Sequence, residues 1–209
     1  MTHAEKISSY LLQIKAIKLQ PKTPFKWASG WNSPIYCDNR VSLSFPVIRS
    51  NIAEGLAFLI KKYYPETEVI AAVATGAIPH GTLVADRLSL PLVYVRSAPK
   101  EHGLGNMVEG FFTPGAKITV VEDLISTGKS SLAAVDALRN AGAVVEGMVA
   151  IFSYGFQHAS DAFEAKKCSL HTLTNYEKVL SKAIEENYIS PEERILLEDW
   201  RKSPQTWKP

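Results

Sequence analysis

Two carboxylates stand directly before a run of small hydroxyl residues in the stretch KITVVEDLISTGKSSLAAVDAL, residues 117–138. They are Glu122 and Asp123, and the run that follows them ends in Gly-Lys-Ser. A P-loop ends in the same way, but it needs a glycine five residues before its second glycine, because its backbone wraps around two phosphates. Asp123 occupies that position here. The spacing therefore excludes the P-loop of nucleotide hydrolases and kinases.

The same stretch still predicts a phosphate site. A β-branched apolar run before the carboxylates is typical of a buried strand, and a helical pattern begins near Leu132. A strand, a small-residue turn and a helix N-terminus aim unpaired N–H groups and a positive dipole end at one point, which suits a single phosphate. The neighbouring carboxylates suit hydroxyl groups that donate hydrogen bonds, or a metal ion. A phosphate beside a diol describes a ribose 5-phosphate.

A plainer interpretation of these residues stays open at this point. In it, Ser130 only caps a helix, and Glu122 and Asp123 are solvated loop residues.

Two further segments carry groups suited to anions. Thr75 and Gly76 follow the predicted strand EVIAAVA and precede a helix, so their turn could offer N–H groups to a second anion. Arg96, Lys100 and His102 lie in the glycine-containing segment RSAPKEHGLGNMVEG. That segment is either a solvated surface loop or a mobile lid that brings cations over an anionic substrate.

Residues 29–40, SGWNSPIYCDNR, combine aromatic and polar side chains. They either form a local core or face a flat ligand, and the segment alone does not decide between the two.

Strands and helices alternate through the middle of the chain and must position these residues. The pattern predicts strands over 68–74, 91–96, 117–123 and 144–154, and helices over 79–88 and 131–142. This alternation predicts an α/β fold with a mostly parallel, twisted sheet covered by helices on both faces. Ligands bind at the carboxyl ends of the strands in such sheets, which is where the loops above are expected to meet.

The flanking regions have different patterns. Residues 3–18 and 47–62 show helical periodicity, whereas residues 19–46 are rich in proline, aromatic residues and serine and predict short strands and turns. Residues 176–202 predict helices broken before Pro191, with Ser190 as a cap.

Composition limits the number of domains and the kinds of partner that the sequence predicts. The 209 residues are 46% hydrophobic and 21% charged, which predicts one ordinary domain, and the net charge of +2 gives no argument for nucleic acid or membrane partners. The two cysteines, Cys37 and Cys168, form neither a disulfide framework nor a metal-ligand pattern. No uncharged apolar run approaches membrane-span length, and we expect a cytoplasmic protein.

Taken together, these segments resemble the type I phosphoribosyltransferases over most of the chain. VVEDLISTGKSS is similar to the motif with which that family binds phosphoribosyl diphosphate, and SGWNSPIYCDNR and VRSAPKEHGLGNMVEG resemble segments of its orotate-specific members. The resemblance implies the type I phosphoribosyltransferase fold in a single domain. A small N-terminal hood would cover about residues 1–46, the core 47–175 and the C-terminal helices 176–209.

The resemblance also implies a reaction. The phosphoribosyl group would pass from 5-phosphoribosyl 1-diphosphate to orotate, giving orotidine 5′-monophosphate and diphosphate. Magnesium would be bound mainly through phosphoribosyl diphosphate, and no residue is assigned as a metal ligand. A homodimer is implied, with each lid closing over the neighbouring subunit's site.

Residue roles follow from the matching positions. The implied catalytic residues are Arg96, Lys100, His102 and Asp123. Those implied to bind substrate are Thr75, Gly76, Glu122, Asp123, Leu124, Ile125, Ser126, Thr127, Gly128, Lys129 and Ser130, with Tyr36 and Arg40 from the hood. Residues 126–130 would hold the 5-phosphate, the acidic pair would face the ribose hydroxyls, and the cations would meet the diphosphate.

The chain departs from the family pattern mainly in its cations. Ala98 and Ala28 stand where relatives carry lysines, and the Thr75-Gly76 turn lacks the lysine of some members. This implies weaker diphosphate binding, unless Lys26 or Lys129 compensates.

Two alternative functions are compatible with the same motifs. One is a phosphoribosyltransferase for another base, and the other is a regulator that senses phosphoribosyl diphosphate without catalysis. A regulator would be expected to carry a nucleic-acid-reading extension and to lose the lid cations, and neither is the case. We therefore expect an enzyme.

Overall fold

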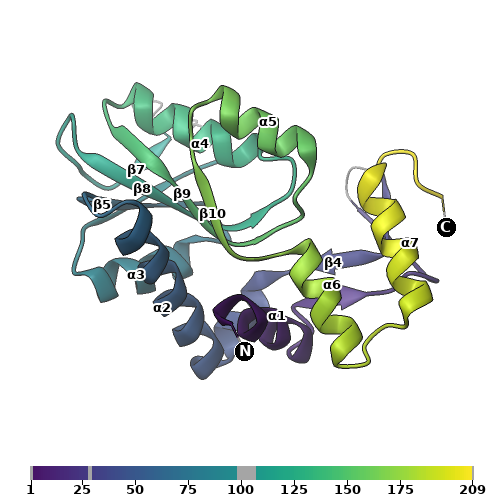
Figure 1. Ribbon diagram of the computed structural model, residues 1–209. Helices are drawn as coiled ribbons and strands as arrows, with labels where there is room; N and C mark the ends of the chain where they lie inside the picture. Colours follow the sequence, from purple (N-terminus) through teal and green to yellow (C-terminus); the bar gives the residue numbers. More distant parts are fainter. Residues whose placement is uncertain (1, 28–29, 98–106, 209) are drawn as a thin grey trace.

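A six-stranded, mostly parallel sheet forms the centre of the molecule (Figure 1). The computed structural model describes residues 2–27, 30–97 and 107–208. The strand order is β10-β9-β8-β5-β6-β7, and only the β6–β7 pair is antiparallel. The strands are β5 (Val69–Val73), β6 (Leu92–Val95), β7 (Val108–Glu109), β8 (Lys117–Ile125), β9 (Val144–Ser153) and β10 (Leu170–Asn175). The predicted α/β class is confirmed.

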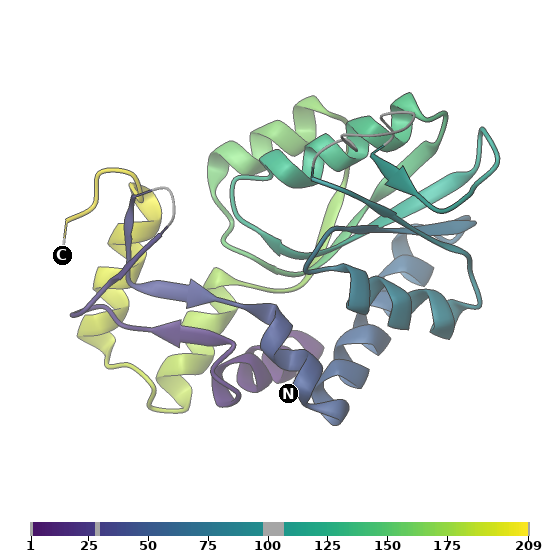
Figure 2. The same cartoon turned by 180° about the vertical axis from the view of Figure 1, so that it is seen from behind.

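Helices cover both faces of this sheet, as the sequence predicts (Figures 1 and 2). Helices α2 (Pro46–Tyr63) and α3 (Ile78–Leu88) lie on one face, and α4 (Lys129–Asn140) and α5 (Gln157–Ala165) lie on the other. Successive strand residues face opposite sides of the sheet. Because helices cover both of these sides, β5 is buried along its whole length. Its Ile70 packs in the core cluster that includes α2, whereas Ala71 packs in the cluster that includes α4.

The described residues that precede α2, up to Phe45, form the region that we call the hood. It contains α1 (His3–Gln13), the antiparallel pair β1 (Ile17–Leu19) and β4 (Ile35–Cys37), the pair β2 (Phe25–Lys26) and β3 (Asn32–Ser33), and the 3₁₀ helix η1 (Asn39–Ser44). The short strands expected over 19–46 are present, and η1 was not expected.

The C-terminal helices α6 (Tyr176–Glu185) and α7 (Pro191–Lys202) complete the core of the hood. Trp200 of α7 is fully buried, and its Nε1 donates a hydrogen bond to the Asn32 carbonyl at 3.0 Å. Its ring meets the Trp27 ring edge to face, with 5.6 Å between the centroids. Figures 1 and 2 show α7 beside the hood strands. The predicted cap Ser190 is confirmed, because it forms a capping box with Glu193.

Several sequence predictions need correction. The helix predicted over 3–18 ends at Gln13, since Lys15 takes a left-handed conformation (φ 56°) and Ile17 enters strand β1. Strand β8 continues past the acidic pair to Ile125. Strand β7 lies inside the segment predicted as a loop over 96–110, and α5 and β10 were not predicted. Within the described ranges, no helix has the length and apolar character needed to cross a membrane.

Candidate functional site

A pocket lies at the carboxyl ends of β5 and β8, where the sequence predicts the ligand. Its volume is about 290 Å³. It is lined by Val73, Ala74, Thr75, Gly76, Glu122, Asp123, Leu124, Ser126, Thr127, Gly128, Ser130 and Ser131. The two strands are hydrogen-bonded neighbours in the sheet, which brings the turns after them together. Most of the predicted substrate-binding residues therefore meet in one hollow.

The turn after β8 presents a bare helix N-terminus to this pocket. Gly128 takes the N-cap position of α4 with φ 78° and ψ −4°, and no side chain caps the helix. A Cβ on Gly128 would lie 2.9 Å from Phe163 Cε2, so both the backbone conformation and the packing require glycine. The Lys129 N–H donates to Thr127 Oγ1 at 3.4 Å, and the N–H groups that follow it in the first turn of α4 are available to an anion. The interpretation of Ser130 as a mere helix cap is wrong, since Ser130 lies inside the first turn.

Three of the predicted binding residues differ in how their side chains lie relative to the pocket. Leu124 lines the pocket, whereas the Ile125 side chain is buried in the core cluster on the α4 face. Lys129 is exposed and is absent from the pocket lining, so only its backbone belongs to the turn. Lys26 is the other lysine that could compensate for the missing family lysines. It is also exposed and does not line the pocket.

The acidic pair belongs to strand β8 and is not a solvated loop. Glu122 is 5% exposed, and its Oε2 accepts a hydrogen bond from Ser131 Oγ at 2.8 Å. Its Oε1 accepts from the Asp123 backbone N–H at 3.0 Å. Burial, followed by the negative charge of Asp123, raises the pKa of the Glu122 carboxyl well above its usual value. Burial and the neighbouring negative charge therefore favour the neutral form of Glu122.

Asp123 is held from two sides. The Asn39 Nδ2 donates a hydrogen bond to the Asp123 carbonyl at 2.6 Å, which fastens η1 of the hood to the end of β8. On the other side, the carboxylate lies against the Cα of Gly76, where an added Cβ would collide with Oδ2. The turn that holds Gly76 also contains a cis peptide bond between Ala74 and Thr75.

A second hollow adjoins the first at this turn. It shares Ala74 and Thr75 with the pocket and is also lined by Arg96. The Arg96 guanidinium lies 3.6 Å from the Glu109 carboxylate, and the Arg96 N–H donates to the Met107 carbonyl at 2.9 Å. Arg96 is thus fixed at the base of the predicted lid. Lys100 and His102, like Ala98, lie outside the described residues.

Tyr36 and Arg40 belong to the hood next to Asn39. Tyr36 lies on β4 and is 39% exposed. The Arg40 guanidinium donates two hydrogen bonds to the Asp38 carboxylate, at 2.7 and 2.9 Å. Those bonds, with a smaller contribution from Asp123, raise the pKa of the Arg40 guanidinium. Arg40 directly follows Asn39, whose side chain contacts the Asp123 carbonyl. Ala28 and Ser29 lie outside the described residues.

Sequence reasoning missed two residues that support the site, Asn39 and Ser131. Ser131 follows the predicted phosphate run directly, and its spacing of nine residues from Glu122 gives no signal of their contact. Asn39 stands in the quoted segment 29–40, but its contact with Asp123 joins residues 84 positions apart.

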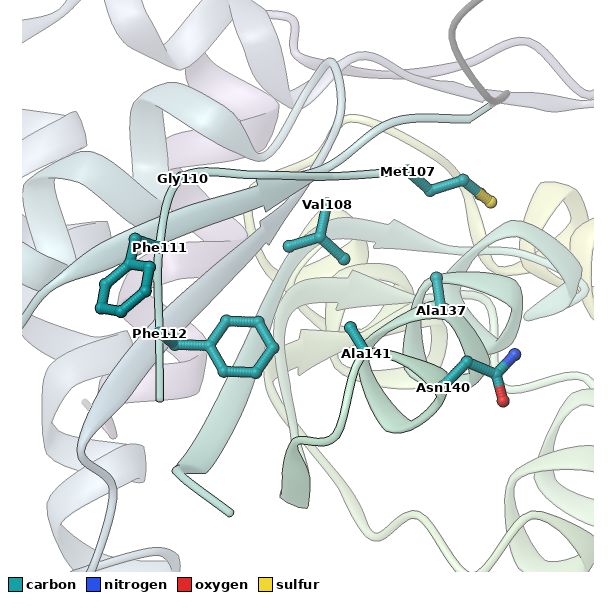
Figure 3. A pocket seen from close by; sticks show the side chains of 8 residues that line it. All are labelled: Met107, Val108, Gly110, Phe111, Phe112, Ala137, Asn140 and Ala141. Carbon is teal, nitrogen blue, oxygen red and sulfur yellow. The ribbon is translucent and has the colours of Figure 1, made fainter. Parts of the chain in front are cut away.

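A third hollow, of about 470 Å³, is not part of this site (Figure 3). Figure 3 shows Phe112 directed toward Ala141 and the Phe111 ring turned the other way. The remaining lining residues are Met107, Val108, Gly110, Ala137 and Asn140. None of the lining residues is ionisable, and the α4 residues among them belong to the opposite end of that helix from the phosphate turn.

Comparison with known proteins identifies the class to which this fold and site belong. Residues 46–183 match the phosphoribosyl transferase domain family. The fold is similar to that of Leishmania donovani UMP synthase, with a TM-score of 0.81 and 21% identity, covering 95% of this chain and 42% of that one. A second similar structure is the orotate phosphoribosyltransferase of Aeropyrum pernix, with a TM-score of 0.75 and 25% identity over 88% of this chain and 99% of that chain. The protein has the fold of the type I phosphoribosyltransferases.

Relatives that match along nearly the whole chain identify the family within this class. The chain is 51% identical to the orotate phosphoribosyltransferase of Cytophaga hutchinsonii over 100% of both chains. It is 57% identical to that of Bacteroides thetaiotaomicron over 94% of this chain and 93% of the relative, and 49% identical to that of Listeria innocua over 99% of both. The chain belongs to the orotate phosphoribosyltransferase family.

Proposed function

We propose that the protein transfers the phosphoribosyl group of 5-phosphoribosyl 1-diphosphate to orotate, which yields orotidine 5′-monophosphate and diphosphate. The observation that carries this proposal is a single pocket in which the uncapped N-terminus of α4 lies beside the Asp123 carboxylate. A phosphate and a sugar diol need these two environments next to each other. The assignment of orotate as the base is supported by the full-length relatives.

The 5-phosphate binds in the turn between β8 and α4. Backbone N–H groups at the start of α4 and the hydroxyls of Ser126, Thr127 and Ser130 donate hydrogen bonds to it. The Lys129 side chain is exposed and absent from the pocket lining, and its backbone N–H already donates to Thr127 Oγ1 at 3.4 Å.

Asp123 accepts hydrogen bonds from the ribose hydroxyls. Asp123 lies next to the phosphate turn. Its carbonyl accepts a hydrogen bond from Asn39, and its carboxylate packs against Gly76. Glu122 supports it from behind through its bond to the Asp123 N–H. In the transition state the ribose ring gains positive charge as the bond from C1 to diphosphate breaks, and a fixed carboxylate nearby stabilises that charge.

The diphosphate lies toward the second hollow, over the Thr75-Gly76 turn. Arg96 lines that hollow and supplies a planar fork of donors. Lys100 and His102 are proposed to add positive charge from the lid, on the strength of the family motif alone. Orotate is already an anion and needs only to be placed beside C1, for which Tyr36 supplies an aromatic face and Arg40 a cation. Ser126 is a further candidate contact.

Magnesium fits this arrangement when it arrives with the substrate. In the described residues, no cluster of three or more acidic, histidine or cysteine side chains could hold a metal ion. Mg²⁺ is commonly bound by one or two carboxylates together with substrate phosphates, and the half-buried Asp123 offers such oxygen atoms beside the phosphate turn, whereas both carboxyl oxygens of Glu122 already accept hydrogen bonds. Bound magnesium supplies positive charge against the charge that develops on the leaving diphosphate.

A homodimer in the cytoplasm is also proposed, with each lid completing the neighbouring site. The homodimer rests on the family resemblance, and the cytoplasmic location rests on the sequence, which has no uncharged apolar run of membrane-span length.

The test is the loss of orotate absorbance on mixing with phosphoribosyl diphosphate and magnesium, with uracil and hypoxanthine as parallel substrates. We expect rapid loss with orotate and no reaction with the other two bases. Asp123→Asn should reduce turnover while leaving the thermal midpoint nearly unchanged, whereas Asp136→Asn, on an exposed face of α4, should alter neither. Turnover with another base alone would overturn the orotate assignment. Tight binding of phosphoribosyl diphosphate without any turnover would favour the regulator.

A further inference from the structure

Asn39 connects the hood to the strand that carries the acidic pair. It opens the 3₁₀ helix η1 and is 1% exposed. Its Nδ2 donates a hydrogen bond to the Asp123 carbonyl at 2.6 Å, and its Oδ1 accepts one from Cys37 Sγ at 3.5 Å. The Asn39 carbonyl accepts a third from Ser42 Oγ at 2.6 Å. Both ends of the Asn39 amide therefore have a partner, which holds the side chain in one orientation.

Asp123 lies where strand β8 has lost one of its two neighbours. The pairing of β8 with β5 extends to Val121, whereas its pairing with β9 extends to Ile125. Backbone groups that a sheet no longer pairs need partners from other elements. The Asn39 amide supplies such a partner to the Asp123 carbonyl. The position of this part of β8 thus depends on the hood as well as on the sheet.

Cys37 is the second component of this connection. It lies on β4, is 8% exposed, and faces the Asn39 amide oxygen. Burial, with smaller contributions from the charges of Asp123 and Asp38, raises the pKa of the Cys37 thiol well above its usual value. The thiol therefore keeps its proton and donates a hydrogen bond to Oδ1. Since the thiol occupies Oδ1, the Nδ2 end of the amide is directed to the Asp123 carbonyl.

We propose that Asn39 is a positioning residue that holds the Asp123 backbone so that the carboxylate meets the ribose hydroxyls, and that Cys37 fixes the Asn39 amide in the required orientation. This inference rests on the proposed role of Asp123 at the ribose. Asn39 does not line the pocket, so it affects the substrate only through the residue that it holds. Its hydrogen bond is made to the backbone carbonyl, which leaves the carboxylate oxygens of Asp123 for the sugar.

A double-mutant cycle of Asn39→Ala with Asp123→Asn, read by kcat, KM and the thermal midpoint, tests this role. Asn39→Ala leaves the Asp123 carbonyl without its donor. We expect kcat to fall by about 10- to 100-fold, with a smaller change in KM for phosphoribosyl diphosphate.

The Asp123→Asn background separates positioning from structural support, because it keeps the carbonyl and removes the carboxylate. In this background Asn39→Ala should change kcat by less than about twofold. It should still lower the thermal midpoint by the same amount as in the wild type, since the hydrogen bond to the carbonyl is lost in both. A bond with a structural role alone would lower kcat equally in the two backgrounds.

Matched variants provide the controls. Asn51→Ala removes another asparagine whose Nδ2 donates to a backbone carbonyl, that of Val47 on α2 at 2.8 Å, and it should leave kcat unchanged. Cys37→Ala removes the donor to Asn39 Oδ1 and should lower kcat by about 3- to 10-fold. Cys37→Ser keeps an O–H donor and should recover most of this loss. Cys168→Ala removes the other buried cysteine and should leave kcat unchanged.

Three results would overturn the inference. They are a kcat of Asn39→Ala within about twofold of the wild type, an equal loss of kcat in the two backgrounds, and equal kcat of Cys37→Ala and Cys37→Ser. If Asn39→Ala does not fold, the two Cys37 variants decide, because recovery by serine supports the inference and equal kcat overturns it. Full activity of Asp123→Asn would instead refute the proposed function of the pocket.

Discussion

Gly76→Ala tests the site without removing any functional group. Gly76 lines the pocket, and its Cα lies against the Asp123 carboxylate. A Cβ built on Gly76 collides with Oδ2 of Asp123, so the carboxylate must turn away or the Thr75-Gly76 turn must move. Since Gly76 does not have a positive φ, alanine causes no left-handed backbone strain there.

The alanine Cβ displaces Oδ2 of Asp123, and the position of this atom determines whether stability or activity falls. It is the far end of a half-buried side chain, and turning it costs less than moving packed backbone, so we expect a loss of stability below about 1 kcal/mol. The same displacement moves the carboxylate by about 1 Å relative to the ribose, and such a misplacement typically costs about 100-fold in rate. We therefore expect kcat/KM to fall by about two orders of magnitude, or roughly 2.7 kcal/mol of transition-state stabilisation.

Gly81→Ala is the matched control. Its Cβ would lie 2.7 Å from the Ala72 Cβ, which is also too close, but this contact is in the packing of α3 against β5. Here we expect the opposite result, with a stability loss of about 1–3 kcal/mol and nearly normal kcat/KM. Urea unfolding and the orotate absorbance assay measure the two quantities. A Gly76→Ala enzyme with kcat/KM within threefold of the wild type would refute the placement of Asp123 at the ribose.

Three further predictions concern the support of the fold. Trp200→Ala should lower the free energy of unfolding by about 3–5 kcal/mol, whereas Trp200→Phe, which loses mainly the bond to a hood carbonyl, should lower it by about 1 kcal/mol in urea titrations. Ser131→Ala removes the hydroxyl that donates to buried Glu122 and should cost about 1–3 kcal/mol, while Ser130→Ala should change the same measurement little. Burial raises the pKa of the Cys168 thiol from 9.0 to about 11, so the folded state keeps a proton that the unfolded chain releases. Stability should therefore fall as the pH rises through this window, by up to about 2 kcal/mol more in the wild type than in Cys168→Ala, and an equal slope in the two proteins would contradict it.

The phosphate turn could be predicted from sequence because all of its signals are local. An apolar β-branched run, two carboxylates, small residues and a helical period follow one another within 22 residues. The position of Thr75 and Gly76 beside that turn also followed, since adjacent parallel strands end at one edge of the sheet. Both inferences needed only the periodicity of the chain and the general geometry of parallel sheets.

Contacts between distant residues could not be predicted in this way. Asn39 reaches Asp123 across 84 residues, and no periodicity links them. Cys37 reads in the sequence as an ordinary packed thiol, and only its contact with Asn39 connects it to the site. Helix α5 was missed because it spans only nine residues, Gln157–Ala165, and no side chain caps its N-terminus, so it lacks the start signal that Ser190 gives to α7.

The bond between Trp200 and Asn32 has a consequence for the order in which the protein is made. The ribosome produces the hood first, but the tryptophan that fills its core follows 168 residues later. At ordinary rates of about 5–20 residues per second, the interval is roughly 10–30 s. During this time Trp27 and neighbouring aromatic side chains of the nascent chain lack their final packing partner. The hood is thus synthesised well before the residue that completes its packing, and it reaches its native structure only after α7 has been made.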